Sequence, residues 1–322
     1  MALLVTGAMG HVGYAVVREA ATLGMPVIAQ YLNTFDRVTA EELGDKVTWV
    51  RCDVADPFEV AALAATHSID GCIHSAALPN DKTARPVPMR AFQSNIASVQ
   101  KLLELARRAK WRRFILVSSG AVFQRWTDAT KPISEAEPPS PVNVYGTTKH
   151  CAELLTSMYH QVYEVSSATV RVSWIYGQPL VPKTFDGPRG PIPEFLRRAL
   201  NGDAVDEPAG GDFAASFTHV VDCALGLLAA YRAPALKHSV YHLGTGENYS
   251  TRRVAQAVQA AVPGSTVRVG PGAAPWTDFT VLRGPLNCDR MREEIGFMPT
   301  MTLEQGVASF AHWMRAHPGQ WA

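Results

Sequence analysis

Residues Leu3–Gly13 read LLVTGAMGHVG, a short apolar run followed by a turn with three evenly spaced glycines. The next residues, Tyr14–Ala20, have the pattern of a helix. In such a strand–turn–helix, Gly7 permits the sharp turn, Gly10 leaves room for a pyrophosphate, and Gly13 lets the helix pack closely on the strand. The unpaired N–H groups at the start of the helix attract phosphate. The stretch therefore predicts a dinucleotide site, although three glycines alone also occur in ordinary βα turns.

Composition narrows the class of protein. The chain has 322 residues, of which 47% are hydrophobic and 18% charged, with a formal net charge of +1. These values fit one large globular domain or two fused ones, and they do not indicate a nucleic acid or a membrane as partner. No apolar run reaches the ~20 residues that cross a bilayer. Because the first strand is expected from residue 3, we expect no signal peptide.

The cysteines and histidines give no indication of a metal. The five cysteines are widely spaced and form no C-x-x-C pair, and the ten histidines are scattered. Such cysteines are typical of reduced, mostly buried thiols in a cytoplasmic protein. We therefore expect a cytoplasmic protein without a metal site.

The first half of the chain alternates apolar strands with amphipathic helices. Strands are expected at 26–31, 47–52, 71–77, 113–119 and 168–172, and helices at 57–66, 91–110 and 143–163. This alternation predicts an α/β fold with a doubly wound parallel (Rossmann) sheet.

After Gly177 the sequence becomes rich in proline and glycine, over 178–193. Helices are expected at 193–201, 220–231, 250–261 and 303–316, with one returning strand near 239–244. We interpret 1–177 as a dinucleotide-binding domain and 178–322 as mostly a smaller, irregular, substrate-binding part.

A tyrosine and a lysine stand four residues apart, in Tyr145–Lys149 (YGTTK), near the start of the long helix expected at 143–163. At this spacing the phenol and the ammonium lie on one helical face. A nearby cation favours the phenolate and lowers the tyrosine pKa, which suits a general acid/base. A surface helix that carries both residues is the alternative interpretation.

Two hydroxyls, Ser118 and Ser119, end the fifth expected strand. In an open parallel sheet, ligands bind beyond the carboxyl ends of the strands. A serine there can hold a substrate oxygen in line with the tyrosine, or it can simply cap the end of the strand.

Taken together, these motifs resemble the extended short-chain dehydrogenases/reductases, the superfamily of NAD-dependent epimerases and dehydratases. The motifs are Thr6-Gly7-x-x-Gly10-x-x-Gly13, Asp53, Ala76-Ala77, Asn95, Ser118-Ser119, Tyr145-x-x-x-Lys149 and Arg171-x-x-x-Ile175-Tyr176-Gly177. The resemblance is strong over residues 1–180 and weaker beyond.

The resemblance implies a role for each of these positions. The pyrophosphate would be held by Gly7, Gly10, His11, Val12 and Gly13. The other cofactor-binding positions would be Asp53 and Val54 at the adenine, Ala76 and Ala77 near the nicotinamide ribose, and Asn95 supporting the active-site helix.

The resemblance also implies the catalytic set. Tyr145 would be the acid/base, Lys149 would bind the ribose hydroxyls and lower the tyrosine pKa, and Ser119 would be the catalytic serine. Trp174 would face a small-molecule substrate. The family commonly forms homodimers through helices that correspond here to 93–109 and 145–163.

One departure concerns the cofactor. The acid that usually binds the adenosine ribose of NAD is replaced by Tyr31. Arg37 could pair with a 2′-phosphate, whereas Asp36 could serve NAD. The sequence leaves NADP and NAD open, and we favour NADP.

A second departure concerns the substrate. Nucleotide-sugar enzymes of the family usually carry Arg-Asp where this chain has Ala215-Ser216. Arg189 or Arg283 could replace that arginine, although their spacing differs. The acidic pair of the dehydratases is replaced by Gly120 and Ala121.

We therefore expect an NAD(P)-dependent oxidoreductase that transfers hydride at a carbinol or carbonyl carbon of a sugar, sugar acid or small polyol. A nucleotide-sugar epimerase that retains its cofactor is the alternative. A non-catalytic dinucleotide sensor is disfavoured, because binding alone does not require Tyr145, Lys149 and Ser119 together.

Overall fold

A computed structural model describes residues 1–126, 128–178, 190–277 and 280–321 of the chain. Its centre is a seven-stranded sheet with the order β11-β6-β5-β4-β1-β2-β3, and every neighbouring pair is parallel. The strands are β1 (Ala2–Thr6), β2 (Val27–Tyr31), β3 (Val47–Arg51), β4 (Ile69–His74), β5 (Arg113–Ser119), β6 (Ser167–Val172) and β11 (Val240–Leu243). This is the parallel, doubly wound Rossmann-type fold that the alternation predicts.

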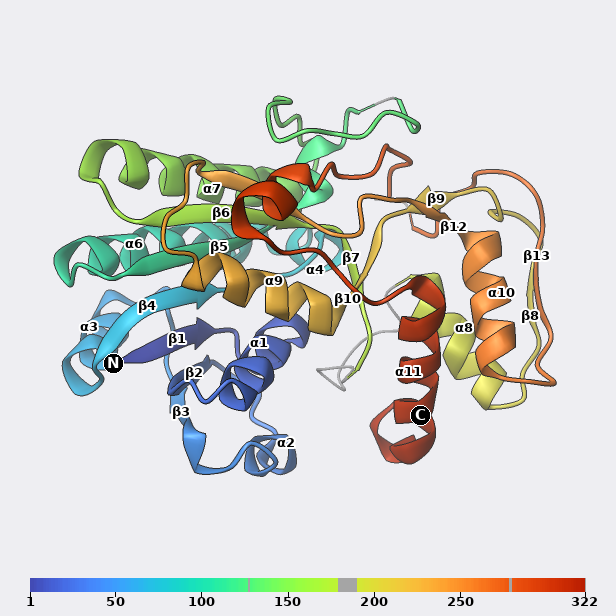
Figure 1. Ribbon diagram of the computed structural model, residues 1–322, viewed down its shortest axis with the longest axis horizontal. Coiled ribbons are helices and arrows are strands. Elements are labelled where there is room, and N and C mark those ends of the chain that lie inside the picture. Colours follow the sequence, from blue (N-terminus) through green and yellow to red (C-terminus); the bar gives the residue numbers. More distant parts are fainter. Residues whose placement is uncertain (127, 179–189, 278–279, 322) are drawn as a thin grey trace.

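The sheet is covered by helices on both faces (Figure 1). One layer contains α1 (His11–Thr22) and α9 (Val220–Arg232). The other contains α3 (Pro57–Thr66), α6 (Ser98–Arg108) and α7 (Val144–Tyr163). Strand β1 serves both layers, because Leu3 and Val5 pack toward α1 while Leu4 packs toward α6. Burial on both faces explains why this strand is a continuous apolar run.

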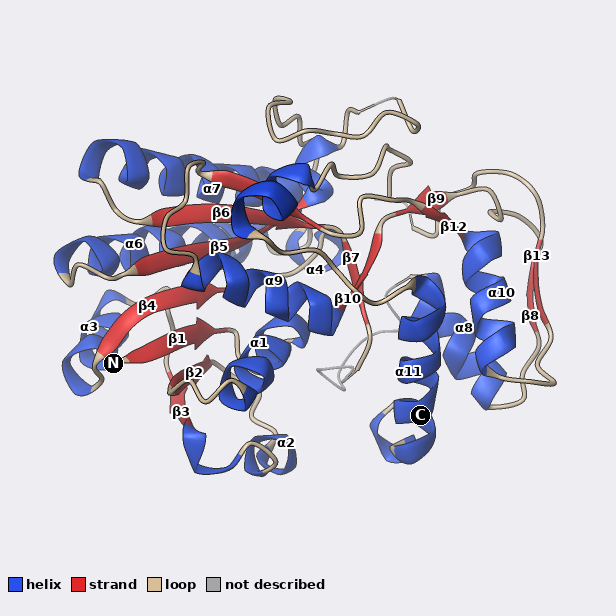
Figure 2. Cartoon of the chain, in the orientation of Figure 1, coloured by secondary structure: helices blue, strands red, loops and turns tan. Residues whose placement is uncertain are grey.

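A second, smaller core lies beside the sheet (Figure 2). Its helices are α8 (Pro191–Leu200), α10 (Thr251–Ala261) and α11 (Leu303–Ala316). Three two-stranded sheets accompany them: β7 (Trp174–Tyr176) with β10 (Phe217–His219), β9 (Ala214–Ala215) with β12 (Tyr249–Ser250), and β8 (Val205–Glu207) with β13 (Val267–Val269).

Short elements complete the described chain. The short α-helices are α2 (Arg37–Glu41), α4 (Asp81–Ala84) and α5 (Pro88–Phe92). Single 3₁₀ turns cover Gly44–Lys46, Gly120–Phe123 and Pro318–Gln320, and π-helical turns cover Gln93–Ala97 and Met291–Ile295.

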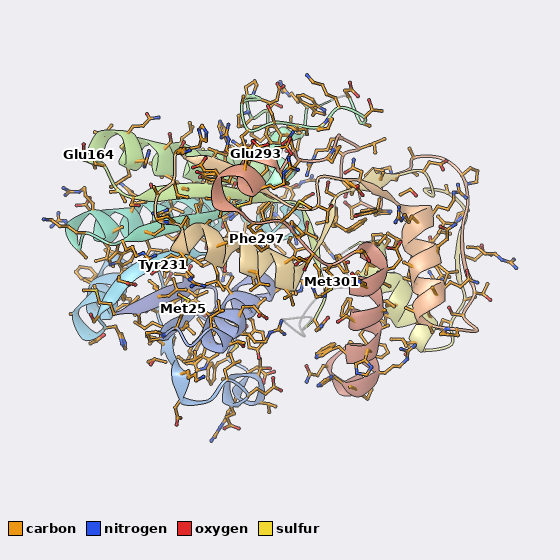
Figure 3. The ribbon with its side chains drawn as sticks, viewed as in Figure 1. Met25, Glu164, Tyr231, Glu293, Phe297 and Met301 are labelled. Carbon is orange, nitrogen blue, oxygen red and sulfur yellow. The ribbon has the colours of Figure 1, made fainter. Side chains whose placement is uncertain are left out.

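Segments from the second half of the chain return to the large sheet. Strand β11 pairs with β6, and α9 packs beside α1. Tyr231 on α9 donates a hydrogen bond to Asp70 Oδ1 at 2.8 Å. Phe297 packs against the same helix, where a Cβ on Gly226 would lie 2.8 Å from its ring (Figure 3). The division of the chain at residue 177 therefore stays an interpretation of sequence composition.

Two expected elements differ in detail. The strand expected to end at residue 77 ends at His74, and the helix expected over 91–110 is divided into a π-helical turn and α6. Within the described residues, no helix is both long enough and apolar enough to span a membrane.

Candidate active site

The glycine turn between β1 and α1 has no space for larger side chains. Gly7 has φ +64°, and a Cβ there would lie 2.8 Å from the backbone of Ala76. A Cβ on Gly13 would lie 2.2 Å from the carbonyl oxygen of Gly7, and one on Gly10 would lie 3.1 Å from that oxygen. Gly7, Ala8 and Gly10 use their N–H groups in hydrogen bonds within the protein, so a phosphate at this turn would meet the N–H groups at the start of α1.

Gln30 fixes this turn to the neighbouring strands. Its side-chain oxygen accepts a hydrogen bond from Gly7 N at 2.9 Å, and its amide nitrogen donates to the carbonyl of Cys52. Gln30 is buried at 1% exposure in an otherwise apolar strand. Gln30 is not among the residues that the motifs predict; its signal in the sequence is an amide among apolar neighbours.

His11, at the first position of α1, also makes a structural contact. Its Nε2 lies 2.9 Å from the carbonyl oxygen of Gly177, at the end of β7. Gly177 has φ +114°, and a Cβ there would lie 2.6 Å from His219 Nε2. The contact joins the dinucleotide turn to the strand that begins the smaller core, and Val12 beside it packs on the large core.

On the expected adenosine side, each candidate side chain has a structural partner. Asp53 accepts a hydrogen bond from Ala55 N at 2.9 Å, and Val54 is buried. Asp36 caps α2 through Thr39 N at 3.2 Å. Arg37 is exposed and lies 2.6 Å from Glu41 in an ion pair on the same helix. Arg37 therefore stands on the surface of α2 with its charge already compensated.

Tyr31, which occupies the position of the usual acid, packs against an aromatic side chain. Its ring centroid lies 4.6 Å from that of Phe35, which in turn contacts Trp49 at 5.8 Å. The end of β2 is thus an aromatic surface rather than a carboxylate.

Asn95 connects the loop after β4 to helix α7. It accepts a hydrogen bond from Leu78 N at 2.8 Å and donates one to Thr148 Oγ1 at 2.9 Å. The loop includes Ala76, whose N–H contacts Thr6 Oγ1 at 3.3 Å, and Ala77. Asn95 is 2% exposed, so it supports the loop expected to lie near the nicotinamide from the interior of the protein.

Tyr145 and Lys149 lie one turn apart on α7, as expected. Lys149 is 5% exposed and donates a hydrogen bond to the carbonyl of Val117 at 2.9 Å. Its Nζ lies 6.0 Å from the centroid of the Tyr145 ring. Burial lowers the pKa of Lys149 to about 8, while Glu153 opposes the shift. The ammonium is therefore fixed near the carboxyl end of β5.

The two serines of β5 differ in their partners. Ser118 donates a hydrogen bond to Glu153 Oε1 at 2.5 Å and is buried. Ser119 Oγ accepts from Ala121 N at 3.1 Å and is less buried. Ser118 is therefore tied into the interior, which leaves Ser119 as the serine at the strand end next to the tyrosine helix.

Glu153 belongs to a buried charged network that no motif in the sequence predicts. Arg171 on β6 donates to both of its oxygens, at 2.9 and 2.8 Å. Both side chains are 4% exposed. His242 lies 3.4 Å from Arg171, and burial together with the Arg171 charge lowers the pKa of His242 to about 3. The network joins α7, β5, β6 and β11 next to the candidate residues Ser119 and Lys149.

A small pocket of about 10 Å³ lies where the residue after β6, Ser173, meets the smaller core. Its described lining includes Trp174 on β7, Ser216, Asn248 and Arg283. Trp174 contacts Trp276 edge-on, with ring centroids 5.3 Å apart. Arg189, the other expected substrate residue, lies outside the described residues. No group of His, Cys, Asp or Glu in the part of the chain that the structure describes could hold a metal ion.

Two enzymes that act on nucleotide-linked sugars, by their names, match the chain along nearly its whole length. The chain is 27% identical to a UDP-glucose 4-epimerase of Mycolicibacterium smegmatis, over 98% of this chain and 99% of that one. It is 28% identical to a dTDP-glucose 4,6-dehydratase of Streptomyces antibioticus, over 100% and 94%.

Solved structures agree in fold. A UDP-glucose 4-epimerase from Thermotoga maritima, solved with UDP-glucose, has a TM-score of 0.87 at 22% identity, covering 99% of this chain and 100% of that one. One from Thermus thermophilus, in complex with NAD, has a TM-score of 0.84 at 24% identity, covering 98% and 99%.

The family model described as "NAD dependent epimerase/dehydratase family" matches residues 3–244. The chain belongs to this family, and it is an enzyme of the short-chain dehydrogenase type. These relatives give no support to the expected preference for NADP.

Proposed function

We propose that the chain is an NAD-dependent oxidoreductase that transfers hydride at a carbinol or carbonyl carbon of a sugar, sugar acid or related small polyol. The observation that carries the proposal is the placement of Lys149. It is buried, bonded to the Val117 carbonyl at 2.9 Å, and one turn from Tyr145, at the strand end that carries Ser119.

The residues of the glycine turn fit NAD. The backbone around Gly7, Gly10 and Gly13 is packed so closely that none of the three positions has room for a side chain. The N-terminus of α1 would face the pyrophosphate. Loop residues Ala76 and Ala77, supported by Asn95, would lie beside the nicotinamide ribose. When bound, NAD supplies the acceptor for the hydride of the carbinol carbon.

The proton is moved by this chain's own residues. The Tyr145 phenolate would take the hydroxyl proton as the carbonyl forms, and the Lys149 ammonium would favour that phenolate. Ser119 would hold the same substrate oxygen in line with the phenol. The absence of an acidic pair at Gly120 and Ala121 favours redox or epimerisation over dehydration.

The cofactor proposed is NAD rather than NADP. The support is that the family model and a solved neighbour name NAD, while Arg37 stands in an exposed ion pair with Glu41. The aromatic contact of Tyr31 with Phe35 offers no charge to the 2′-phosphate of NADP.

Substitution of Tyr145 tests the mechanism. Tyr145→Phe removes the phenol and is expected to abolish turnover of NAD with sugars and sugar acids. The dissociation constant of NADH should stay within a few-fold, and NADH should bind more tightly than NADPH. Tyr163→Phe, at the other end of α7, is the matched control and should retain wild-type rates. Unchanged activity in Tyr145→Phe would contradict the proposal.

A second candidate function is a nucleotide-sugar epimerase that retains its NAD. It is supported by relatives named as 4-epimerases that match this chain along its whole length. Such an enzyme would interconvert UDP-glucose and UDP-galactose without net formation of NADH and would be purified with NAD bound. Net NADH formation from a sugar or sugar acid favours the first candidate instead.

We also propose that the enzyme is a homodimer that pairs α6 and α7 with their copies. The support is the apolar surface that α7 exposes, where Leu154 and Val162 are 58% and 64% exposed. Exposed apolar residues grouped on one helix are typical of an interface.

A further inference from the structure

Arg283 reaches from the pocket to the residue that follows the catalytic serine. A Cβ on Gly120 would lie 2.5 Å from Arg283 Nη2 and 3.3 Å from its Cζ. The guanidinium therefore occupies the space that any side chain at position 120 would fill. Gly120 directly follows Ser119 in the chain, and Arg283 also lines the pocket with Trp174 and Ser216.

The charge of Arg283 is not compensated by any described side chain. No acidic group within the described ranges forms an ion pair with it, and burial alone lowers its pKa, to about 10. Arg283 is of intermediate exposure, so its guanidinium is partly withdrawn from water without a partner, and an anion that binds it would relieve this cost. The arginine of the buried network, Arg171, differs because it is paired with Glu153.

The backbone around Arg283 is fixed on both sides. Its own carbonyl accepts a hydrogen bond from Asn248 Nδ2 at 2.7 Å. After it, Ile133 N donates to the carbonyl of Pro285 at 2.8 Å, and Asn287 N donates to the carbonyl of Ile133 at 2.8 Å. Such anchoring fixes the backbone that carries the cation before a ligand arrives, which lowers the entropic cost of binding.

We propose that Arg283 binds a carboxylate on the substrate, close to the carbon at which Ser119 and Tyr145 act. The inference rests on the proposed function and assigns its substrate class, a hydroxy acid of the sugar type. A planar carboxylate matches the two parallel N–H groups of a guanidinium.

The charge of the pocket favours a monoanion. Among the described residues that line it, Arg283 carries the only charge, and its neighbours include Trp174, Ser216, Asn248 and Leu286. One guanidinium neutralises one carboxylate. A diphosphate carries at least two negative charges, and the second would remain uncompensated in a partly enclosed site.

Binding tests the proposal separately from catalysis. With NADH at saturation, thermal shifts are measured for a panel of four- to six-carbon aldonic and uronic acids, including D-gluconate and D-glucuronate. The matched neutral sugars, D-glucose 6-phosphate and UDP-glucose are the other arms. We expect at least one acid to raise Tm and its neutral counterpart to have little effect.

Three variants locate the effect at Arg283. Arg283→Gln should weaken binding of the acid ~10- to 100-fold, as loss of a charge-assisted hydrogen bond does, and Arg283→Lys should restore part of it. Gly120→Ala should weaken it too, because the new methyl group displaces the guanidinium. Arg268→Gln, at an exposed residue of strand β13, is the control and should bind like wild type.

The outcomes separate the two proposals. If the acid binds to wild type but not to Arg283→Gln, the carboxylate assignment holds whether or not turnover is seen. If none of the acids binds, if neutral sugars, the phosphate or UDP-glucose bind better, or if Arg283→Gln binds the acid equally well, the assignment is wrong. If the wild type oxidises a neutral sugar and Tyr145→Phe does not, the proposed function holds even where the carboxylate assignment is wrong.

Discussion

Lys149 is a cation held in the interior, and its burial couples its charge to folding. Its pKa is about 8 in the folded protein and 10.5 in its ordinary state. Between these values the unfolded chain binds more protons than the folded one, so the contribution of Lys149 to stability rises with pH.

Lys149→Met should remove this contribution. From pH 8 to pH 10.5, the free energy of unfolding of the wild type should rise relative to the variant, by at most about 3 kcal/mol. Urea unfolding of both proteins at several pH values measures the difference. If the difference in free energy of unfolding between the two proteins stays constant with pH, or if the wild type loses stability relative to the variant, Lys149 is not desolvated as described.

At the level of single residues, the sequence predicts side-chain neighbours only where they lie close together in the chain, within one helix or one turn. The spacing of Tyr145 and Lys149 places both on one face of a helix, because the helical repeat fixes their separation. The partners of Gln30 and Arg283 depend on strands and loops far apart in the chain. The sequence offers Arg283 as a candidate for the substrate and shows Gln30 as an amide among apolar residues, but no local pattern identifies the partners of either residue.

Helix α7 is held against β5 and β6 by charges as well as by apolar packing. Glu153 bonds to Ser118 and Arg171, and all three are buried. Removal of one member of a buried ion pair leaves the other charge without compensation, which costs more than the intact pair contributes.

A double-mutant cycle measures this coupling. Glu153→Gln and Arg171→Met should each lower the free energy of unfolding by about 3–5 kcal/mol. The double variant should be more stable than the sum of the two losses implies. The control is the surface pair of Arg253 and Glu304, 3.1 Å apart and half exposed, whose loss should cost less than about 1 kcal/mol. Additive losses at Glu153 and Arg171 would contradict the network.

Among the elements, long periodic segments were predictable and short ones were not. The expected bounds of α3, β5 and α11 agree with the structure, because their apolar periodicity continues over whole elements. The pairs β7–β10 and β9–β12 are two or three residues long and depend on tertiary contacts. The π-helical turn at Gln93–Ala97 places Asn95 between a loop and a helix, which helical periodicity does not predict.

At the scale of the whole molecule, the exposed apolar face of α7 makes the homodimer testable. Leu154→Asp places a charge on that face and should shift the protein to a monomer in sedimentation at micromolar concentration. Phe58→Asp changes a residue that is 83% exposed on α3, outside the proposed interface, and should leave the assembly unchanged. A wild-type protein that sediments as a monomer would contradict the proposed pairing.

The parallel sheet was predictable as a whole because alternating strands and helices allow few topologies. The position of the second half was less predictable. Strand β11 and helix α9 join the large sheet, whereas α8, α10 and α11 build a separate core.

The close fit of Gly120 and Arg283 has a consequence for the evolution of this family. The two positions share one volume, so a side chain at 120 and a long side chain at 283 exclude each other. Related sequences should therefore covary at this pair, with glycine at 120 where arginine stands at 283 and a shorter residue at 283 where 120 is larger. In an alignment, the residues at 120 and 283 would then separate relatives that bind a negatively charged substrate group from relatives that bind a neutral one.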